Sequence, residues 1–367
     1  MREDDLGVTY PIIDETICVS CGKCYDTCPN NQDLKGERPI KVYAAWSTNK
    51  DTRITSASGG IASELYRHFI AISGSSYGVY LNSEQEAHFI PVNSYEDILK
   101  VRNSKYVYSE MGDVYHSIQK QLEDSKRVLF IGLPCQVAGV KSFLGKDYDN
   151  LILVDIICHG VMPWIYLQQH VNNIIKIKDA ELQVQFRDPK LKTAKFCFTI
   201  RKKGKLLYKT DNLSDDLYQH GYHGGVCYRE NCYNCQYAQI ERLGDITISD
   251  FSGLGRISPI YYSPENVSCL LVNTSKGEQL LRDLEGRIEI DERPFSEAYD
   301  YESMLQHPTP RPEIRDVFVS TYKKTRDYDQ AAEQAMHDSI KEFVYRHYSW
   351  HAKWKKLKRM IKKFIKR

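Results

Sequence analysis

The chain has 367 residues, of which 42% are hydrophobic, and its 50 Lys and Arg residues nearly balance 48 Asp and Glu residues, giving a formal net charge of +2. A chain of this length forms about two domains with their own cores, and the composition excludes a disordered or fibrous protein. No apolar run reaches the roughly 18 residues of a membrane-spanning helix, and the first residues lack a signal-peptide pattern. We therefore expect a cytoplasmic protein.

Eleven cysteines are too many for an ordinary cytosolic enzyme, and the composition is not that of a small disulfide scaffold, so metal or redox chemistry is the first hypothesis. Residues 1–45 are rich in Cys, Gly, Pro and Asp, which predicts a small ferredoxin-like module organised by a cofactor. Its thiols have the C-x2-C-x2-C-x3-C-P spacing that binds a [4Fe-4S] cluster in bacterial ferredoxins: Cys18, Cys21, Cys24 and Cys28. A zinc knuckle is the alternative.

Residues 46–275 have the patterns of a central mixed α/β domain. The expected elements are a helix at 61–72, a strand at 77–81, a strand at 127–132, a helix at 136–144 and a strand at 151–157. The last three form a strand–helix–strand unit, which places Cys135 and Cys158 at the carboxyl ends of parallel strands. Open α/β sheets bind their ligands at this edge.

Two residues at this edge are candidates for catalysis. Cys135 follows Pro134 at the expected start of a helix, where the helix dipole lowers the pKa of a thiol and favours a redox or covalent role. His159 is a candidate proton donor, although a single His at a strand end is more often structural. We rank a metal-ligand role above the nucleophile for Cys135, because no His–Asp partner set is visible.

The segment from 182 to 275 adds a hairpin at 182–210 and strands at 245–250 and 267–272. Between them lies a loop with the C-x4-C-x2-C spacing, formed by Cys227, Cys232 and Cys235. Plant-type ferredoxins share this spacing, and a zinc or purely structural thiol cluster is the alternative. Two further thiols, Cys197 and Cys269, lie within apolar strands and are expected to be small core residues.

The thiols are numerous enough for one or two cubane clusters. In two-cluster ferredoxins the fourth Cys of the run binds the other cluster. Our hypothesis is that Cys18, Cys21 and Cys24 hold one cluster, while Cys28 joins the 227–235 loop in holding a second. Cys135 or Cys158 would complete that set.

The sequence contains neither G-x-G-x-x-G nor a P-loop motif, so a standard nicotinamide or nucleotide site is not indicated. Several segments together resemble the coenzyme F420 hydrogenase/dehydrogenase beta-subunit family, over most of residues 8 to 270. The matching segments are Tyr10 to Cys24, Ser58 to Gly60, Asn103 to Tyr106, Val128 to Gly139, Asp155 to Gly160, and Cys232 to Cys235 with Gly244 to Phe251. Longer relatives carry two ferredoxin runs, and residues 10–29 look like the second of these.

The resemblance implies an iron–sulfur flavoprotein that passes electrons between its clusters and FAD to a small organic substrate or a deazaflavin coenzyme, in some relatives within surface-polysaccharide pathways. The alternative is an electron-transfer subunit that relays electrons to a redox partner protein. The residues that match family motifs, and that the resemblance places around the flavin, are Ser58, Gly59, Gly60, Asn103, Ser104, Lys105, Gly132, Pro134 and Gln136.

Residues 276–345 have helical patterns, and the basic segment 346–367 ends the chain. Within 350–367, apolar residues recur at helical spacing among Lys and Arg, which is typical of a helix lying on the anionic inner face of a membrane. A helix packed on the body or on a partner is the alternative. Nine basic residues from Lys353 onward leave the remainder of the chain acidic, so we do not expect nucleic acid as a ligand.

Overall fold

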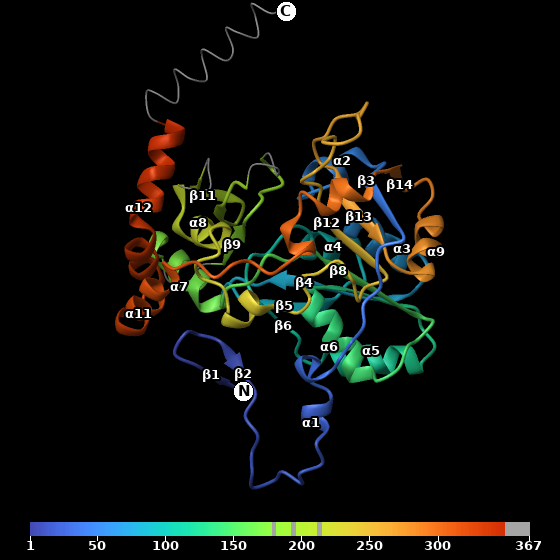
Figure 1. The fold of residues 1–367 in the computed structure, drawn as a ribbon, viewed down its shortest axis with the longest axis horizontal. Helices are drawn as coiled ribbons and strands as arrows, with labels where there is room; N and C mark the ends of the chain where they lie inside the picture. The colour runs from blue at the N-terminus through green and yellow to red at the C-terminus, as the bar shows by residue number, and fades with distance from the viewer. Residues whose placement is uncertain (178–180, 192–195, 211–214, 349–367) are drawn as a thin grey trace, which may run out of the picture.

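The computed structural model describes residues 1–177, 181–191, 196–210 and 215–348, with side chains to residue 342. Its largest sheet in this part of the chain is mixed and has nine strands (Figure 1). In spatial order these are β14 (Ile288–Glu292), β3 (Lys41–Ser47), β13 (Ser268–Val272), β12 (Ile246–Asp250), β8 (Leu151–Ile156), β7 (Val128–Gly132), β4 (Ser75–Leu81), β5 (Ala87–Pro91) and β6 (Ser109–Glu110). The expected strands and helices of the central domain outside the hairpin occur within two residues of their predicted bounds.

The central strands β12, β8, β7 and β4 run parallel, and both of their faces are buried. Leu129 of β7 packs into one core with α3 (Ile61–Ala71), α4 (Tyr95–Val101) and α9 (Ser275–Asp283). Phe130 packs on the opposite face with α5 (Val114–Glu123) and α6 (Pro134–Leu144). Helices on both faces explain why these strands are continuously apolar in the sequence.

A second core lies beside the sheet and is rich in tyrosine (Figure 1). It contains α7 (Trp164–Ile174), α8 (Leu217–His223), α11 (Arg315–Thr325), α12 (Tyr328–Tyr348), and a three-stranded sheet of β9 (Leu182–Gln185), β10 (Thr199–Lys202) and β11 (Lys205–Lys209). The antiparallel pair β10–β11 is the predicted hairpin. Residues 276–345 are shared between the cores, because β14 pairs with β3 whereas α11 and α12 pack on α7 and α8.

His170 joins three helices of the second core. Its Nε2 lies 2.9 Å from a carboxylate oxygen of Asp216, which caps α8, and its Nδ1 lies 2.6 Å from a carboxylate oxygen of Asp329 in α12. Burial lowers the pKa of His170, but the two carboxylates outweigh burial and raise it to about 9. His170 therefore stays charged at neutral pH, and the ion triad stabilises the packing of α7 against α8 and α12.

This triad makes stability fall at alkaline pH. Because the folded pKa is raised, the contribution of His170 is complete below its unfolded pKa and is lost as the pH rises through about 9. We expect His170→Gln to remove on the order of 2–3 kcal/mol of unfolding free energy at pH 6 and much less at pH 10. Urea unfolding of both proteins at the two pH values measures this difference, and a difference that does not change with pH would refute the assignment.

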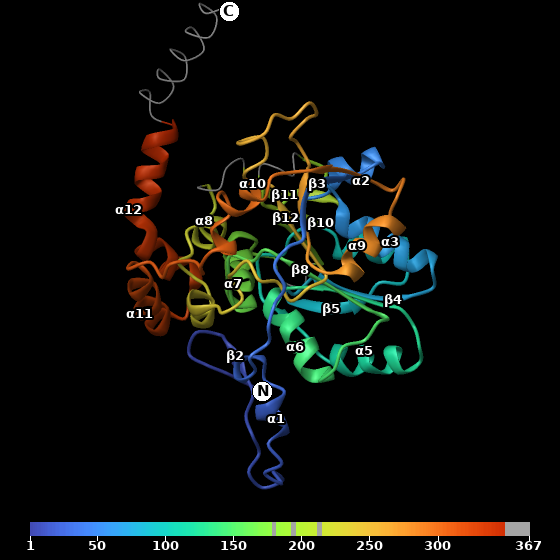
Figure 2. The ribbon, with the colours of Figure 1, turned by 45° about the vertical axis from the view of Figure 1, so that its right-hand side comes forward.

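The N-terminal residues form a protruding segment (Figures 1 and 2). It comprises β1 (Arg2–Glu3), β2 (Thr9–Tyr10), α1 (Lys23–Asp26) and the 3-10 turn η1 (Pro29–Asn31). The remaining short elements are α2 (Lys50–Thr55), η4 (Glu230–Asn234), α10 (Phe295–Tyr299) and η5 (Ser303–Leu305). The predicted mixed α/β fold is thus confirmed. No helix in the described ranges is long and apolar enough to cross a bilayer, and the predicted tail helix at 350–367 lies outside them.

Candidate metal centre

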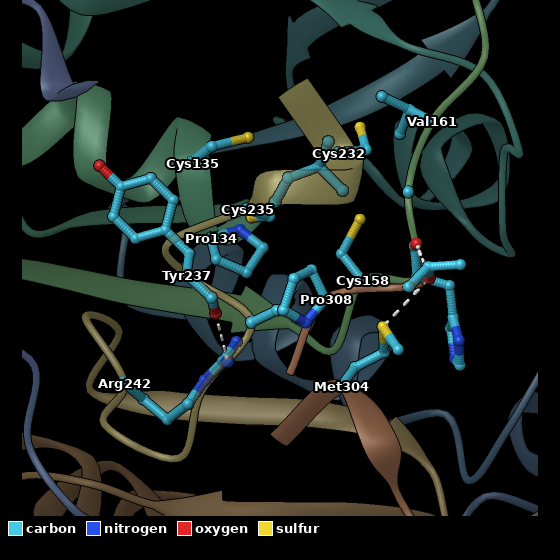
Figure 3. A pocket seen from close by; sticks show the side chains of 15 residues that line it. Pro134, Cys135, Cys158, Val161, Cys232, Cys235, Tyr237, Arg242, Met304 and Pro308 are labelled. Atoms are coloured by element: carbon cyan, nitrogen blue, oxygen red, sulfur yellow. Dashed lines mark hydrogen bonds between the residues drawn. The ribbon is translucent and has the colours of Figure 1, made fainter. Parts of the chain in front are cut away.

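Four thiols from three segments line one pocket at the carboxyl edge of the sheet (Figure 3). Gly132 of β7 pairs with Asp155 of β8. The chain reaches Cys135 three residues after Gly132, and Cys158 three residues after Asp155. The parallel register therefore brings these two thiols to the same edge, as predicted. Cys232 and Cys235 reach the pocket from η4 and its end.

A buried arginine fixes the loop that carries Cys232 and Cys235. Arg315 donates from Nε to a carboxylate oxygen of Glu230 at 3.0 Å and from Nη1 to the carbonyl oxygen of Val226 at 2.9 Å. Its guanidinium also lies 5.0 Å from the ring centroid of Tyr233. Tyr233 in turn donates its hydroxyl to the carbonyl oxygen of Gly225 at 2.7 Å. The loop is held at both ends of its short helical turn, so its two thiols have a fixed position.

A second buried ion pair supports the pocket from the sheet side. Asp155 of β8 is fully buried and lies 3.2 Å from a guanidinium nitrogen of Arg242. Its carboxylate also accepts a 2.5 Å hydrogen bond from the hydroxyl of Thr247. Arg242 lines the pocket and donates to the carbonyl oxygen of Tyr237 at 3.2 Å. The ion pair thus connects the strand that precedes Cys158 to the chain that follows Cys235.

The pocket wall is mostly apolar, and it includes Pro134, Val161 and Met304. Burial, followed by the neighbouring Cys235 and Cys232, raises the pKa of Cys135 to about 12. Burial and neighbouring thiols likewise raise the pKa of Cys158. The pKa of Cys135 is thus shifted opposite to the direction expected from the helix dipole at the start of α6, while its side chain is exposed at the surface. Burial also raises the pKa of Cys232, and a metal centre bound here would displace the protons of these thiols.

A single metal ion and a cubane cluster need thiol donors at different separations. In the described part of the chain, no three Cys, His, Asp or Glu side chains lie close enough together to coordinate a single metal ion. A cubane separates its four thiolates by iron and sulfide, so it needs a wider set than a tetrahedral zinc ion does.

Two of the predicted ligands lie elsewhere. Cys227 is fully buried in the second core, where its thiol contacts the hydroxyl of Tyr328. Cys28 does not line the pocket and remains in the N-terminal segment. Cys197 and Cys269 are buried core residues, as predicted.

The N-terminal thiols form a separate group. Cys18, Cys21 and Cys24 are exposed on the protruding loop, and Cys28 is partly buried where the loop returns to the body. Pro29, directly after Cys28, accepts hydrogen bonds at its carbonyl oxygen from the Tyr237 hydroxyl at 3.1 Å and the Gln236 amide at 3.2 Å. Tyr237 also lines the pocket, so one side chain contacts both the pocket and the residue that follows Cys28.

The residues predicted around the flavin form two sets. Ser58, Gly59 and Gly60 lie in the loop before α3, where Asn103 accepts a 2.7 Å hydrogen bond from the amide of Ala57. Ser58 donates its hydroxyl to the carbonyl oxygen of Val267 at 3.0 Å. A side chain at Gly59 would lie 2.1 Å from a backbone oxygen, so the close approach of two chains requires glycine here. The two motifs are brought together near the carboxyl end of β12.

Most of the other residues predicted around the flavin form hydrogen bonds within the protein. Lys105 donates to the carbonyl oxygens of Val101 and Arg102 at the end of α4, and burial lowers its pKa to about 7. Ser104 hydrogen bonds with Tyr106. Gln136 is buried, accepts from the amide of Leu133 and donates to Ser109. Pro134 lines the thiol pocket, whereas a side chain at Gly132 would meet the ring of Phe130 at 2.7 Å.

One ion pair at the end of β12, between Arg187 and Asp250, was not predicted from the sequence. Arg187 is buried and binds Asp250, the last residue of β12, through both carboxylate oxygens. Its other donors reach the hydroxyl of Tyr106 at 3.0 Å and the carbonyl oxygen of Ala57 at 2.7 Å. The pair thus holds the Ser58 loop against the sheet. No local motif contains it, because its two members are 63 residues apart.

His159 lies at the rim of the thiol pocket. Its ring is half exposed, with Nε2 3.7 Å from a carboxylate oxygen of Glu302, and its carbonyl oxygen accepts a 2.6 Å hydrogen bond from Thr309. This position leaves the ring accessible beside the four thiols, and its catalytic role stays a prediction.

Two family models match parts of the chain. Residues 11–32 match the model of the 4Fe-4S binding domain, and residues 125–298 match the model of the C-terminal part of the coenzyme F420 hydrogenase/dehydrogenase beta subunit. The coenzyme F420-dependent sulfite reductase of Methanocaldococcus jannaschii is 26% identical over 134 residues, which are 35% of this chain and 21% of that protein. The matched segment thus spans about a fifth of that relative.

Among solved structures, a chain of the F420-reducing [NiFe] hydrogenase complex from Methanosarcina barkeri is similar, with a TM-score of 0.48 and 16% identity. The match covers 82% of this chain and 92% of that one. The C-terminal family domain contains Cys135, Cys158, Cys232 and Cys235, and the 4Fe-4S domain contains the N-terminal run. Residues 125–298 are thus similar to the C-terminal part of the coenzyme F420 hydrogenase/dehydrogenase beta subunit, and a 4Fe-4S binding domain precedes them in the chain.

Proposed function

We propose that the protein is an oxidoreductase with two [4Fe-4S] clusters, one on the N-terminal run and one held by Cys135, Cys158, Cys232 and Cys235. The observation that carries the proposal is the meeting of these four thiols in one apolar pocket (Figure 3). When bound, the clusters would supply one-electron transfer. The protein's own contribution is to fix the thiols through Arg315 and to keep water away with Pro134, Val161 and Met304.

Iron and acid-labile sulfide analysis of the anaerobically purified chain tests this function. Two cubanes predict about eight irons and about eight sulfides per chain. About four of each would remove one cluster from the proposal, and stoichiometric zinc without sulfide would overturn it.

A flavin is the third cofactor that we propose, at the edge where the Ser58 loop and the Asn103 motif meet. Support comes from the proximity of these motifs to the carboxyl end of β12, where α/β sheets bind ligands. The side-chain donors of Ser58, Asn103 and Lys105 are already paired within the protein, so their part is to shape the loop. FAD released by acid from the purified protein, at about one per chain, is the expected result of chromatographic analysis.

Tyr237 connects the two thiol groups, and we expect it to keep the N-terminal segment docked. In Tyr237→Phe the hydroxyl that donates to Pro29 is lost, while Gln236 keeps its own bond. Loss of about 1 kcal/mol should raise local opening around Pro29 about fivefold. Exchange of the backbone amide hydrogens of residues 30–34 measures this, with Tyr25→Phe as the matched control because Tyr25 is exposed. Equal exchange in the two variants would contradict the role of Tyr237.

The proposal has two versions, which differ in whether the electron acceptor is a small molecule or a partner protein. In the first, reduced flavin passes electrons to a small organic molecule or a deazaflavin coenzyme near His159, whose ring is accessible. In the second, the chain relays electrons to a partner protein, as the exposed N-terminal thiols favour. Reoxidation of the reduced chain by an added small substrate, without a partner protein, supports the first version, and its absence across candidate substrates supports the second.

A further inference from the structure

The protruding N-terminal loop has an unusually apolar surface. Three of its large apolar side chains are mostly exposed, with Ile17 at 77%, Val19 at 83% and Tyr25 at 66% of their surface. Ile12 and Ile13 are more than half exposed beside them. These residues surround Cys18, Cys21 and Cys24 in the sequence, and the thiols are exposed as well. Contiguous exposed apolar residues of this kind mark sites of protein–protein contact.

The charge of the same segment is strongly one-sided. Residues 1–33 contain seven acidic side chains, at positions 3, 4, 5, 14, 15, 26 and 33, against two basic side chains, Arg2 and Lys23, which is a net charge of −5. Asp5 pairs with Arg326 of the body at 2.8 Å, whereas Glu15, just before the thiol run, and Asp26, within it, are both exposed. An apolar centre with an acidic rim is complementary to a partner with a basic rim.

We propose that this loop is the docking surface for a one-electron redox protein with a basic face around its exposed cofactor. The inference rests on the proposed cluster of the N-terminal run and names the partner class for it. Figures 1 and 2 both show the loop projecting from the body, so a partner can reach the thiols without meeting the large sheet. When bound to Cys18, Cys21, Cys24 and Cys28, a reduced cluster would supply the one electron that the partner's oxidised cofactor gains, with no transfer of a proton or an atom.

Cytochrome c is a suitable probe, because it is small, basic and accepts one electron at an exposed haem edge. The full chain, reduced with dithionite and desalted, is mixed with ferricytochrome c in a stopped-flow instrument. We expect the second-order rate to fall about tenfold or more between about 20 mM and about 500 mM NaCl, since exposed charges are screened beyond a Debye length. Calorimetric titration of the oxidised chain with cytochrome c should show binding at the low salt concentration alone.

Substitutions test whether the N-terminal loop is the surface that binds cytochrome c. The double charge reversal Glu15→Lys and Asp26→Lys should lower the low-salt rate at least about fivefold and flatten its salt dependence. Glu289→Lys, an exposed change on β14 in the large sheet, should leave both unchanged. Val19→Ser should lower the rate at every salt concentration without changing the slope.

The outcomes separate this proposal from the proposed function. A chain with both clusters by iron analysis but with a rate independent of salt and of Glu15 and Asp26 overturns the docking surface alone. Loss of the cluster at the N-terminal run refutes both. Light scattering that shows a dimer dispersed by Val19→Ser would instead assign the surface to a second copy of the chain and overturn the proposal.

Discussion

Replacement of Asp155 by leucine is expected to lower the unfolding free energy by about 3–5 kcal/mol, because it leaves the buried guanidinium of Arg242 without its carboxylate. The hydroxyl of Thr247 also loses its 2.5 Å acceptor. Asp155→Asn keeps the shape of the side chain but removes its charge, so we expect a smaller loss, of about 2–3 kcal/mol. Urea denaturation followed by circular dichroism measures both values.

The effect should extend to the thiol pocket. Arg242 lines the pocket, and Asp155 lies on the strand that leads to Cys158. We therefore expect both Asp155 variants to retain less iron than the parent chain. Glu278→Gln is the matched control, because the ion pairs of Glu278 with Lys41 and Arg282 lie at the surface and the change should alter stability by less than about 0.5 kcal/mol. Asp155→Leu with the stability of this control would contradict the assignment.

Removal of Cys232 should halve the iron content of the protein. Cys232→Ala takes one of four thiols from the pocket and leaves the N-terminal run intact, so we expect about eight irons per chain to fall to about four. The remaining cluster should still absorb visible light and be reduced by dithionite. Iron and sulfide analysis of the anaerobic variant gives the result directly.

Cys227→Ala is the sharpest control for this experiment. Cys227 belongs to the same C-x4-C-x2-C run, but its thiol packs in the second core against Tyr328. We expect its replacement to leave iron unchanged and to lower the unfolding free energy by about 1 kcal/mol through the small cavity that it creates. Loss of iron in Cys227→Ala together with normal iron in Cys232→Ala would reverse the ligand assignment.

The sequence predicted several central elements of the large sheet but not its strand order or its outer strands. Its buried strands are continuous apolar runs and its helices have a regular apolar spacing, so β7, α6 and β8 were predictable. The same unit predicted that Cys135 and Cys158 would lie at one edge, because the register of parallel strands carries them there. The ferredoxin spacing is equally local, and the match of residues 11–32 confirms it.

The spacing of the cysteines in the 227–235 run does not tell which of them line the pocket, and contacts with distant parts of the chain determine this. The run from 227 to 235 has one pattern, yet Arg315, a residue of α11 far along the chain, fixes the loop so that Cys232 and Cys235 enter the pocket while Cys227 enters the aromatic core. The raised pKa of Cys135 likewise depends on neighbours brought by folding. Arg187 with Asp250 and Arg242 with Asp155 are separated widely in sequence, so no motif signals them.

Electron paramagnetic resonance of the dithionite-reduced protein is the most direct measurement of whether the two thiol groups hold two neighbouring clusters. Since Tyr237 lines the pocket and bonds Pro29, the residue after Cys28, we predict two signals, each integrating to about one spin per chain, that broaden one another through magnetic interaction. Cys232→Ala should leave one signal without that broadening. A single sharp signal in the unmodified chain, or two signals that do not interact, would contradict the account.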